Sequence, residues 1–305
     1  MPETVHTPVL LHEVIDILTI HDGMTVLDCT AGGGGHAERI CSLIGSGGRY
    51  IGLDADTRAV DIVRARLGND PRVTVLHENF RNAHTALAAV GVDHVDRILI
   101  DLGLSSDHLA RADGTGRGFS FLVDEPLLMT FDSEQREDTT TAYDVVNSWS
   151  EASLADVIFG FGGERSARRI ARAIVESREH EPIRTSAQLA QCVADAIGRR
   201  GARHPATKTF QAIRMAVNDE LGALADMLRN TEELLAPGGR IAVISFHSLE
   251  DGLVKRTFRA WRDRGLGDIL TGKPIVPSHE ESVTNARARS AKLRAFEYAT
   301  RVYAS

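Results

Sequence analysis

The stretch VLDCTAGGGGHAERI, residues 26–40, decides the fold class of this 305-residue chain. An apolar run ends at Asp28, four consecutive glycines occupy Gly32 to Gly35, and an amphipathic segment follows from about His36. Glycines permit positive φ angles and let backbone N–H groups approach a ligand at the start of a helix. A strand, a glycine turn and a helix in this order are typical of the ligand-binding start of an α/β domain.

The chain after this stretch repeats the alternation of strand and helix. We expect strands over residues 24–30, 49–56, 73–80 and 96–103, separated by helices from about His36, over 60–67 and over 83–89. Strands that alternate with helices form βαβ units, so the sheet should be parallel. Two later strands are expected over 240–248 and 291–299, the second of them at an edge of the sheet.

About 140 residues separate the fourth and fifth expected strands, far more than the dozen or so that a crossover helix needs. Residues 141–200 have helical periodicity and two capping-box pairs, Ser148 with Glu151 and Thr185 with Gln188. We therefore expect an all-helical subdomain inserted into the α/β domain. The expected parts are 1–108 and 206–305 for the α/β domain and 109–205 for the insertion, with one helix over 209–230 returning to the sheet.

The composition is that of a soluble globular protein, with 43% hydrophobic and 25% charged residues. Cys29, Cys41 and Cys192 form no CxxC pair, so we expect neither a disulfide framework nor a metal site. The chain has no run of about 18 apolar residues and no secretory signal, which predicts a cytoplasmic protein without a membrane partner.

The glycine turn is compatible with two adenosine cofactors. Gly32, Gly34 and Ala37 satisfy the GxGxxA pattern of nicotinamide dinucleotide sites. Asp54, 22 residues after Gly32, suits a ribose in either class. Asp28 favours S-adenosylmethionine, because a carboxylate attracts the ammonium group of a methionine moiety and repels a pyrophosphate.

Further polar residues follow the later strands. The fourth strand runs into DLGLSSDHL, residues 101–109, which brings Asp101, Ser105 and His108 to the carboxyl edge of the sheet, where open α/β folds bind ligands. Phe80, at the end of the third strand, suits an adenine face and a core position equally well. After the fifth strand, His247 and Ser248 reach the same edge, but without a GxSxG elbow they do not predict a hydrolase.

Gln211, Arg214 and Asn218 form a polar stripe at i, i+3 and i+7 on an otherwise apolar helical segment. Such a stripe needs partners. Hydrogen bonds within the protein explain it as well as contacts with a substrate do. Arg214 and Asn218 are therefore candidate substrate contacts with an equally good internal interpretation.

Several longer motifs together carry a family resemblance. They are HTPVLLHEV (6–14), DCTAGGGGH (28–36), DLGLSS (101–106), HPATKTFQAIRMAVNDEL (204–221), ISFHSLED (244–251) and NARARSAKLR (285–294). In this order they resemble the bacterial RsmH (MraW) family, which methylates the N4 amine of a cytidine in 16S ribosomal RNA. The resemblance implies a class I S-adenosylmethionine methyltransferase fold, Rossmann-like, with an inserted helical substrate domain. It also implies a target in the decoding region, cytidine 1402 in the standard RNA numbering.

Matched residue by residue, the resemblance implies cofactor contacts for Gly34, Gly35, His36, Asp54, Phe80 and Asp101. His108, also expected in the cofactor site, stands where the family usually has Gln, which adds a titratable side chain. The family's PLDMRMD reads PLLMTFD here, with Leu128, Thr130 and Phe131 in place of Asp, Arg and Met. That change removes an acid and a base together from the start of the insertion.

The implied reaction has a poor nucleophile, because the lone pair of cytosine N4 is delocalised into the ring. We expect Asp101, with Ser105 as a second candidate, to accept hydrogen bonds from the amine and so help the nitrogen to pyramidalise. Arg117 is expected near the RNA. A nicotinamide oxidoreductase and a non-catalytic RNA-binding assembly factor stay open as alternatives, and a homodimer is a further expectation.

The net charge of −7, taken whole, argues against a nucleic-acid partner. The charge is, however, distributed unevenly. Residues 1–160 hold 11 basic and 25 acidic residues, whereas residues 161–214 hold 11 and 5, and residues 251–305 hold 11 and 6. We therefore expect RNA to lie across residues 163–178 and 285–294, with Arg168 and Arg172 as contacts.

Overall fold

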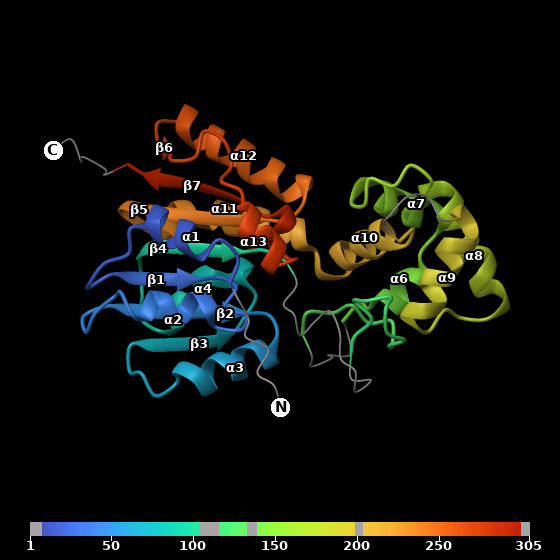
Figure 1. Ribbon diagram of the computed structural model, residues 1–305, viewed down its shortest axis with the longest axis horizontal. Helices are drawn as coiled ribbons and strands as arrows, with labels where there is room; N and C mark the ends of the chain where they lie inside the picture. The colour runs from blue at the N-terminus through green and yellow to red at the C-terminus, as the bar shows by residue number, and fades with distance from the viewer. Residues whose placement is uncertain (1–7, 104–115, 133–138, 199–203, 300–305) are drawn as a thin grey trace. The chain divides into compact units, whose positions relative to one another are not determined.

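The computed structural model describes residues 8–103, 116–132, 139–198 and 204–299 (Figure 1). The chain divides into two compact units, a sheet unit (residues 1–103 and 221–305) and a helical unit (residues 104–220). The second boundary therefore falls after Glu220, whereas the sequence pattern placed it after residue 205. We describe each unit by itself.

The sheet unit contains a seven-stranded sheet in the order β3-β2-β1-β4-β5-β7-β6. The strands are β1 (Thr25–Asp28), β2 (Arg49–Asp54), β3 (Val73–His77), β4 (Val95–Asp101), β5 (Leu235–Ser245), β6 (Gly267–Ile269) and β7 (Lys292–Tyr298). β1 to β5 are parallel, and β7 runs antiparallel to both β5 and β6. The expected α/β class is confirmed, and the interposed β7 distinguishes this sheet from the 3-2-1-4-5-6 order of dinucleotide-binding domains.

One strand prediction was wrong in its position. β7 lies inside the sheet, because the short strand β6 pairs with its outer side, from Gly267 opposite Tyr298 to Ile269 opposite Phe296. Three residues that include a glycine carry no apolar alternation, so the sequence offered no signal for β6.

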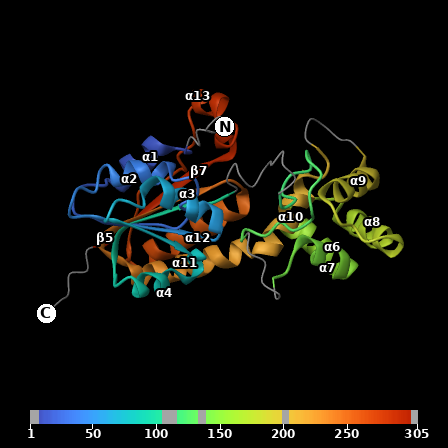
Figure 2. The same cartoon turned by 90° about the horizontal axis from the view of Figure 1, so that it is seen from below.

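Helices cover both faces of the sheet, as Figure 2 shows. One layer consists of α1 (Leu11–Leu18), α2 (Gly35–Cys41) and α3 (Thr57–Leu67), and the other of α4 (Ala83–Ala89), α11 (Glu220–Leu234) and α12 (Ser248–Asp263). Successive strand residues point to opposite faces, so Val26 and Leu27 are both fully buried but belong to different hydrophobic cores. Burial on both faces explains the nearly continuous apolar runs that identified these strands. The short elements η1 (Phe80–Asn82), α13 (His279–Thr284) and η2 (Ala288–Ser290) complete the unit.

The helical unit is built from five helices in its described part: α6 (Ala142–Ser148), α7 (Glu151–Gly160), α8 (Ala167–His180), α9 (Ser186–Ile197) and α10 (Thr207–Asn218). Their apolar stripes meet in one core, to which each helix contributes a fully buried residue: Val145, Ile158, Ile170, Leu189 and Ile213, in that order. The expected insertion of helices is therefore present.

Two local predictions at helix ends had different outcomes. The capping box of Thr185 and Gln188 starts α9 as expected. The pair of Ser148 and Glu151 is not a capping box, because Ser148 is the last residue of α6 and Ser150 caps α7 by accepting a hydrogen bond from the Ser153 amide.

The expected single helix over 209–230 is two helices. Asp219 has a φ angle of 45°, in the left-handed region, which ends α10 before α11 begins at Glu220. α10 packs against α6 and α7, and α11 packs on the sheet. This break explains why only the second half of the segment belongs to the sheet unit. No helix among the described residues has the length and apolarity needed to cross a membrane.

Candidate active site

Three acidic residues end neighbouring strands at one edge of the sheet. Asp54 is the last residue of β2, Asp28 of β1 and Asp101 of β4, and β1 lies between the other two strands. The carboxyl ends of parallel strands meet at the same edge, where open α/β folds bind ligands. The topology therefore gathers the three carboxyl groups that the sequence pattern singled out.

The glycine turn after β1 is tied to the end of β2. Gly32 has a φ angle of 52° and Gly34 one of 81°, both in the region that favours glycine, and Gly34 precedes the first residue of α2. The Gly32 amide donates to Oδ2 of Asp54 over 2.8 Å, and the Asp56 amide donates to Oδ1 of Asp54 over 2.9 Å. Asp54 thus holds the glycine turn in place through hydrogen bonds to two backbone amides.

Asp28 is buried, with 1% of its surface exposed. Its Oδ1 accepts a hydrogen bond from the Thr30 amide over 3.1 Å, and its Oδ2 accepts one from the hydroxyl of Tyr50 over 2.9 Å. Burial raises the pKa of Asp28 from 3.8 to about 6, the charge of Asp54 adds to this rise, and the two hydrogen bonds oppose it. Sequence reasoning missed Tyr50, whose only signal was an aromatic residue in the strand RYIGLD.

Asp101 is paired with the buried ring of His36. Nδ1 of His36 lies 3.8 Å from Oδ2 of Asp101, and Nε2 of His36 lies 3.2 Å from the carbonyl oxygen of Val9. A carbonyl oxygen only accepts, so Nε2 carries a proton and donates it. Nδ1, an acceptor in this tautomer of the neutral ring, therefore lies toward the carboxyl group of Asp101.

The other carboxyl oxygen of Asp101 is the unusual atom of this site. Oδ1 is buried, and it has no hydrogen-bond partner among the described residues. Burial raises the pKa of Asp101 from 3.8 to about 7, and the charges of Asp28 and Glu250 add to the rise, whereas the guanidinium of Arg287 opposes it. Two neighbouring carboxyl groups with raised pKa values form a site that a cationic ligand would stabilise.

Phe80 begins η1, three residues after His77, the last residue of β3. Its ring is partly buried and packs against the core on the α4 face of the sheet. The core interpretation is thus supported, and the remaining exposed surface leaves the adenine contact as a prediction. Ser105 and His108 lie outside the described residues.

The expected RNA contacts of the helical unit fall into two groups, of which the first has partners inside the unit. Arg117 is 7% exposed, and its Nη1 donates to the Phe131 carbonyl over 2.6 Å. Arg214 forms two hydrogen bonds with the carboxylate of Glu220, of 2.6 and 2.8 Å. Asn218 accepts from the Phe131 amide over 2.8 Å and donates to the Met129 carbonyl over 2.7 Å. These contacts favour the internal interpretation of the polar stripe and leave a role of Arg117, Arg214 or Asn218 in RNA binding as a prediction only.

The second group is exposed. Arg168 and Arg172 lie on the solvent face of α8, opposite the fully buried Ile170 and Ile174. Arg172 approaches Glu151 at 3.7 Å, but both side chains are largely exposed, so this pair is weak and leaves the guanidinium accessible. The geometry is that of a solvated basic face.

The PLLMTFD departure also lies inside the helical unit. Thr130 is 3% exposed, and its hydroxyl donates to the Asp132 carbonyl over 2.9 Å. The ring of Phe131 stacks on that of Phe119 with 6.0 Å between centroids. The two replacements are thus built into the packing of this segment.

Known proteins match this chain over nearly its whole length. Residues 3–299 match the sequence profile of the MraW methylase family. A protein of Paenibacillus sp. (strain JDR-2) named ribosomal RNA small subunit methyltransferase H is 44% identical over 317 residues, covering 96% of this chain and 98% of the relative. Relatives of the same name from Deinococcus deserti and Deinococcus radiodurans are both 46% identical, covering 96% and 98% of this chain and 93% and 91% of the relatives. Neither a nicotinamide oxidoreductase nor a non-catalytic assembly factor is compatible with these matches, and the chain belongs to the MraW methylase family.

Proposed function

We propose that this methylase transfers a methyl group from S-adenosylmethionine to the exocyclic N4 amine of a cytidine in 16S ribosomal RNA, expected at cytidine 1402. The name of the relatives supports ribosomal RNA of the small subunit as the substrate. The motif resemblance supports the cytidine amine. The observation that carries the proposal is the buried Oδ1 of Asp101, which has no partner among the described residues and lies at the ligand edge of the sheet.

The residues at this edge fit the cofactor. When bound, S-adenosylmethionine supplies a methyl group on a positively charged sulfur, together with an ammonium group. Asp28 and Asp101 are buried carboxyl groups whose pKa values are raised, and nearby positive charge would offset the cost of ionising them. Asp54, at the end of β2, suits the ribose, and Gly34 and Gly35 let the backbone approach the ligand where α2 begins.

Asp101 has two tasks in the proposed reaction. Its Oδ1 accepts a hydrogen bond from the N4 amine, which orients the nitrogen and favours its pyramidal form. As N4 gains a bond to carbon it must lose one proton, and a carboxylate with a pKa of about 7 is a suitable acceptor near neutral pH. Nδ1 of His36 lies 3.8 Å from the other oxygen, Oδ2. Ser105 keeps its place as a second candidate.

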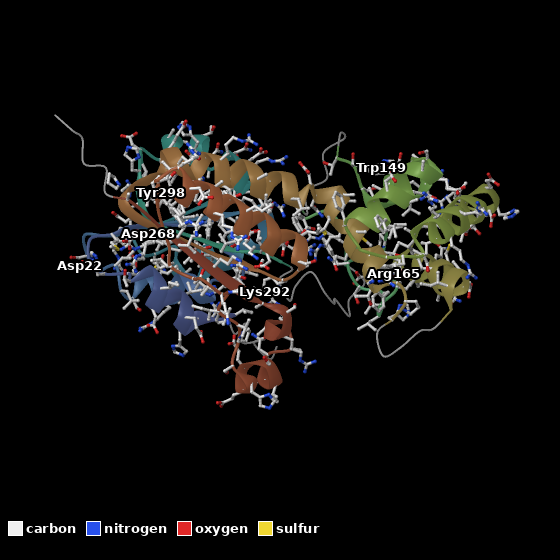
Figure 3. All side chains as sticks on the ribbon, turned by 90° about the horizontal axis from the view of Figure 1, so that it is seen from above. Asp22, Trp149, Arg165, Asp268, Lys292 and Tyr298 are labelled. Atoms are coloured by element: carbon white, nitrogen blue, oxygen red, sulfur yellow. The ribbon has the colours of Figure 1, made fainter. Side chains whose placement is uncertain are left out.

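The basic face of α8 supports RNA as the substrate. Arg165, labelled in Figure 3, precedes the helix, and Arg168, Arg169 and Arg172 are exposed along it. Guanidinium groups donate to phosphate oxygens in pairs and stay charged at every relevant pH. We expect the enzyme in the cytoplasm, where its substrate is found. We also expect a homodimer, which analytical sedimentation of the purified protein tests.

Mass-spectrometric mapping of small-subunit RNA, from cells with and without this gene, tests the proposal. We expect one cytidine to lose an N4 methyl group in the absence of the gene. An unchanged cytidine pattern contradicts the proposed reaction.

A second experiment tests the role of Asp101 with purified protein and radiolabelled S-adenosylmethionine. Asp101→Asn should bind the cofactor and transfer little methyl to RNA. Asp93→Asn, which changes an exposed carboxylate just before the other end of β4, is the matched control and should transfer normally. Full transfer by Asp101→Asn with normal cofactor binding would show that this carboxylate is not the amine acceptor.

A further inference from the structure

The sheet unit contains a pocket near the same edge of the sheet. It is a cavity of about 390 Å³ lined by the start of α12, the segment before α13 and the residues that lead into β7. Its polar lining includes His247, Ser248, Ser282, Arg289, Ser290 and Lys292. Lys292, labelled in Figure 3, is the first residue of β7. We call this cavity the basic pocket, and it includes part of the segment 285–294, over which the charge distribution predicts RNA.

The pocket carries excess positive charge. The segment NARARSAKLR, residues 285–294, contains four basic residues and no acidic one. Asp251 of α12 is shared between two cations: its Oδ2 lies 3.3 Å from Nζ of Lys292, and its Oδ1 accepts from Nε of Arg294 over 2.6 Å. One carboxylate therefore offsets two cations, and the charge of Arg289 is additional.

Arg289 and Lys292 each have one contact within the protein and keep exposed surface that an anion can reach. Nε of Arg289 donates to the Ser282 carbonyl over 3.0 Å, which fixes the plane of an otherwise exposed guanidinium. Lys292 keeps 39% of its side chain exposed beside its contact with Asp251. Held cations lose little conformational freedom when they bind an anion, which favours affinity.

The first turn of α12 adds donors. Glu250 accepts from the amides of Phe246 and His247, so its charge is directed to the chain before the helix. The backbone amide of Ser248 and the hydroxyl of the same residue have no hydrogen-bond acceptor among the described residues. Both groups would be available to an anion at the positive end of this 16-residue helix.

The register of the sheet places this pocket close to Asp101. Asp101 pairs with Ile244 of β5, and Ile244 pairs with Leu293 of β7. Two strand spacings separate Asp101 from Leu293, about 10 Å between backbones. Two residues of the pocket lining are close to this pair in the chain: Lys292 is next to Leu293, and Ser248 lies shortly after the end of β5. That separation is comparable with the distance between a base and its own backbone phosphate.

We propose that this basic pocket binds a backbone phosphate of the RNA substrate, next to the nucleotide whose amine meets Asp101. This inference rests on the proposed function. Arg289 and Lys292 neutralise the phosphate, and the first turn of α12 donates to its oxygens. The contact fixes where the strand lies and carries no sequence preference of its own.

The test uses the full chain with Arg289→Gln and Lys292→Met combined, and a fluorescent single-stranded RNA fragment of the decoding region. The control, Lys255→Met with Arg262→Gln, removes the same charge from exposed positions on α12. We expect the pocket variant to bind RNA at least about tenfold more weakly. The slope of log affinity against log salt should fall by about 0.7, the value for one lost phosphate contact. The control should keep both.

Calorimetric binding of S-adenosylmethionine supplies the second readout. Unchanged cofactor affinity in the pocket variant supports the proposal. Three outcomes overturn the proposal. The control variant could lose RNA binding equally, the pocket variant could lose cofactor binding with intact RNA binding, or neither affinity could change. If the double variant folds poorly, Arg289→Gln alone replaces it, because this change leaves the pair of Lys292 and Asp251 intact. The single variant should also bind RNA more weakly than the wild type, by a smaller factor than the double variant. These readouts measure binding, so failure of the cytidine methylation itself would be seen separately.

Discussion

Asp28→Asn should stabilise the cofactor-free protein while it weakens cofactor binding. The carboxyl group is buried, with its oxygens bonded to the Thr30 amide and the Tyr50 hydroxyl. Asparagine keeps the same shape: its oxygen accepts from the amide, and its NH₂ group donates to a Tyr50 hydroxyl that has turned to accept. The substitution therefore removes a buried charge and keeps both contacts, although the proton of the Tyr50 hydroxyl then gives up its acceptor on residue 28.

The expected magnitude follows from the pKa of Asp28. A rise from 3.8 to about 6 corresponds to about 3 kcal/mol, an upper value for the cost of ionising this group in the folded protein. The unfolded chain releases the proton near pH 4 and the folded chain near pH 6, so stability falls as the pH rises between these values. Asp28→Asn should thus be more stable than the wild type by about 1–3 kcal/mol above about pH 7, and equal to it below about pH 4.

Urea unfolding at several pH values, without cofactor, measures this difference. Asp22→Asn changes an exposed carboxylate of the same unit, labelled in Figure 3, and should shift stability by less than about 0.5 kcal/mol. Calorimetry should find the affinity of Asp28→Asn for S-adenosylmethionine lowered by about tenfold or more, because the ammonium group loses its carboxylate partner. A variant that is less stable than the wild type at high pH, or a difference that does not change with pH, would refute the reasoning.

Three further outcomes are expected. The rate of methyl transfer should rise with pH through the pKa of Asp101, about 7, because only the ionised carboxylate accepts a hydrogen bond and then a proton from the amine. Single-turnover assays at several pH values measure this rate, and a rate that does not change with pH would contradict the role of Asp101. Asn218→Ala should lower the unfolding free energy by about 1–3 kcal/mol in urea, since it removes three partly buried hydrogen bonds. Gln211→Ala, on the same stripe, should cost less than about 1 kcal/mol. Arg168→Glu combined with Arg172→Glu should weaken RNA binding at least about tenfold in a filter assay and leave cofactor binding unchanged; equal loss of both would mean that α8 acts only in folding.

Some of the site could be predicted because its signals are local. Asp28, Asp54 and Asp101 each follow an apolar run directly, and parallel strands bring such positions to one edge. The glycine turn needs only neighbouring residues to adopt its backbone shape. Periodicity likewise identified the helices of the insertion, because an amphipathic stripe is written within a single segment.

Other features depended on residues far apart in the chain. Asn218 bonds to the backbone of Phe131, 87 residues away, so the spacing of the stripe alone left substrate contact and internal contact equally good. α10 ends before Asp219 and packs against α6 and α7, whereas residues 209–230 alone have the pattern of one helix. The position of β7 depended on the unexpected pairing with β6.

The sequence by itself determined the α/β class, the inserted helices, the family resemblance and the acidic positions at the ends of the strands, because each is recorded in short-range order along the chain. Only the tertiary structure decided what those positions can do. It buried Asp28 beside Tyr50 and set His36 against one oxygen of Asp101, leaving the other without a partner among the described residues. Burial and the proximity of charges control the pKa of a carboxyl group, and both arise only when distant segments pack together.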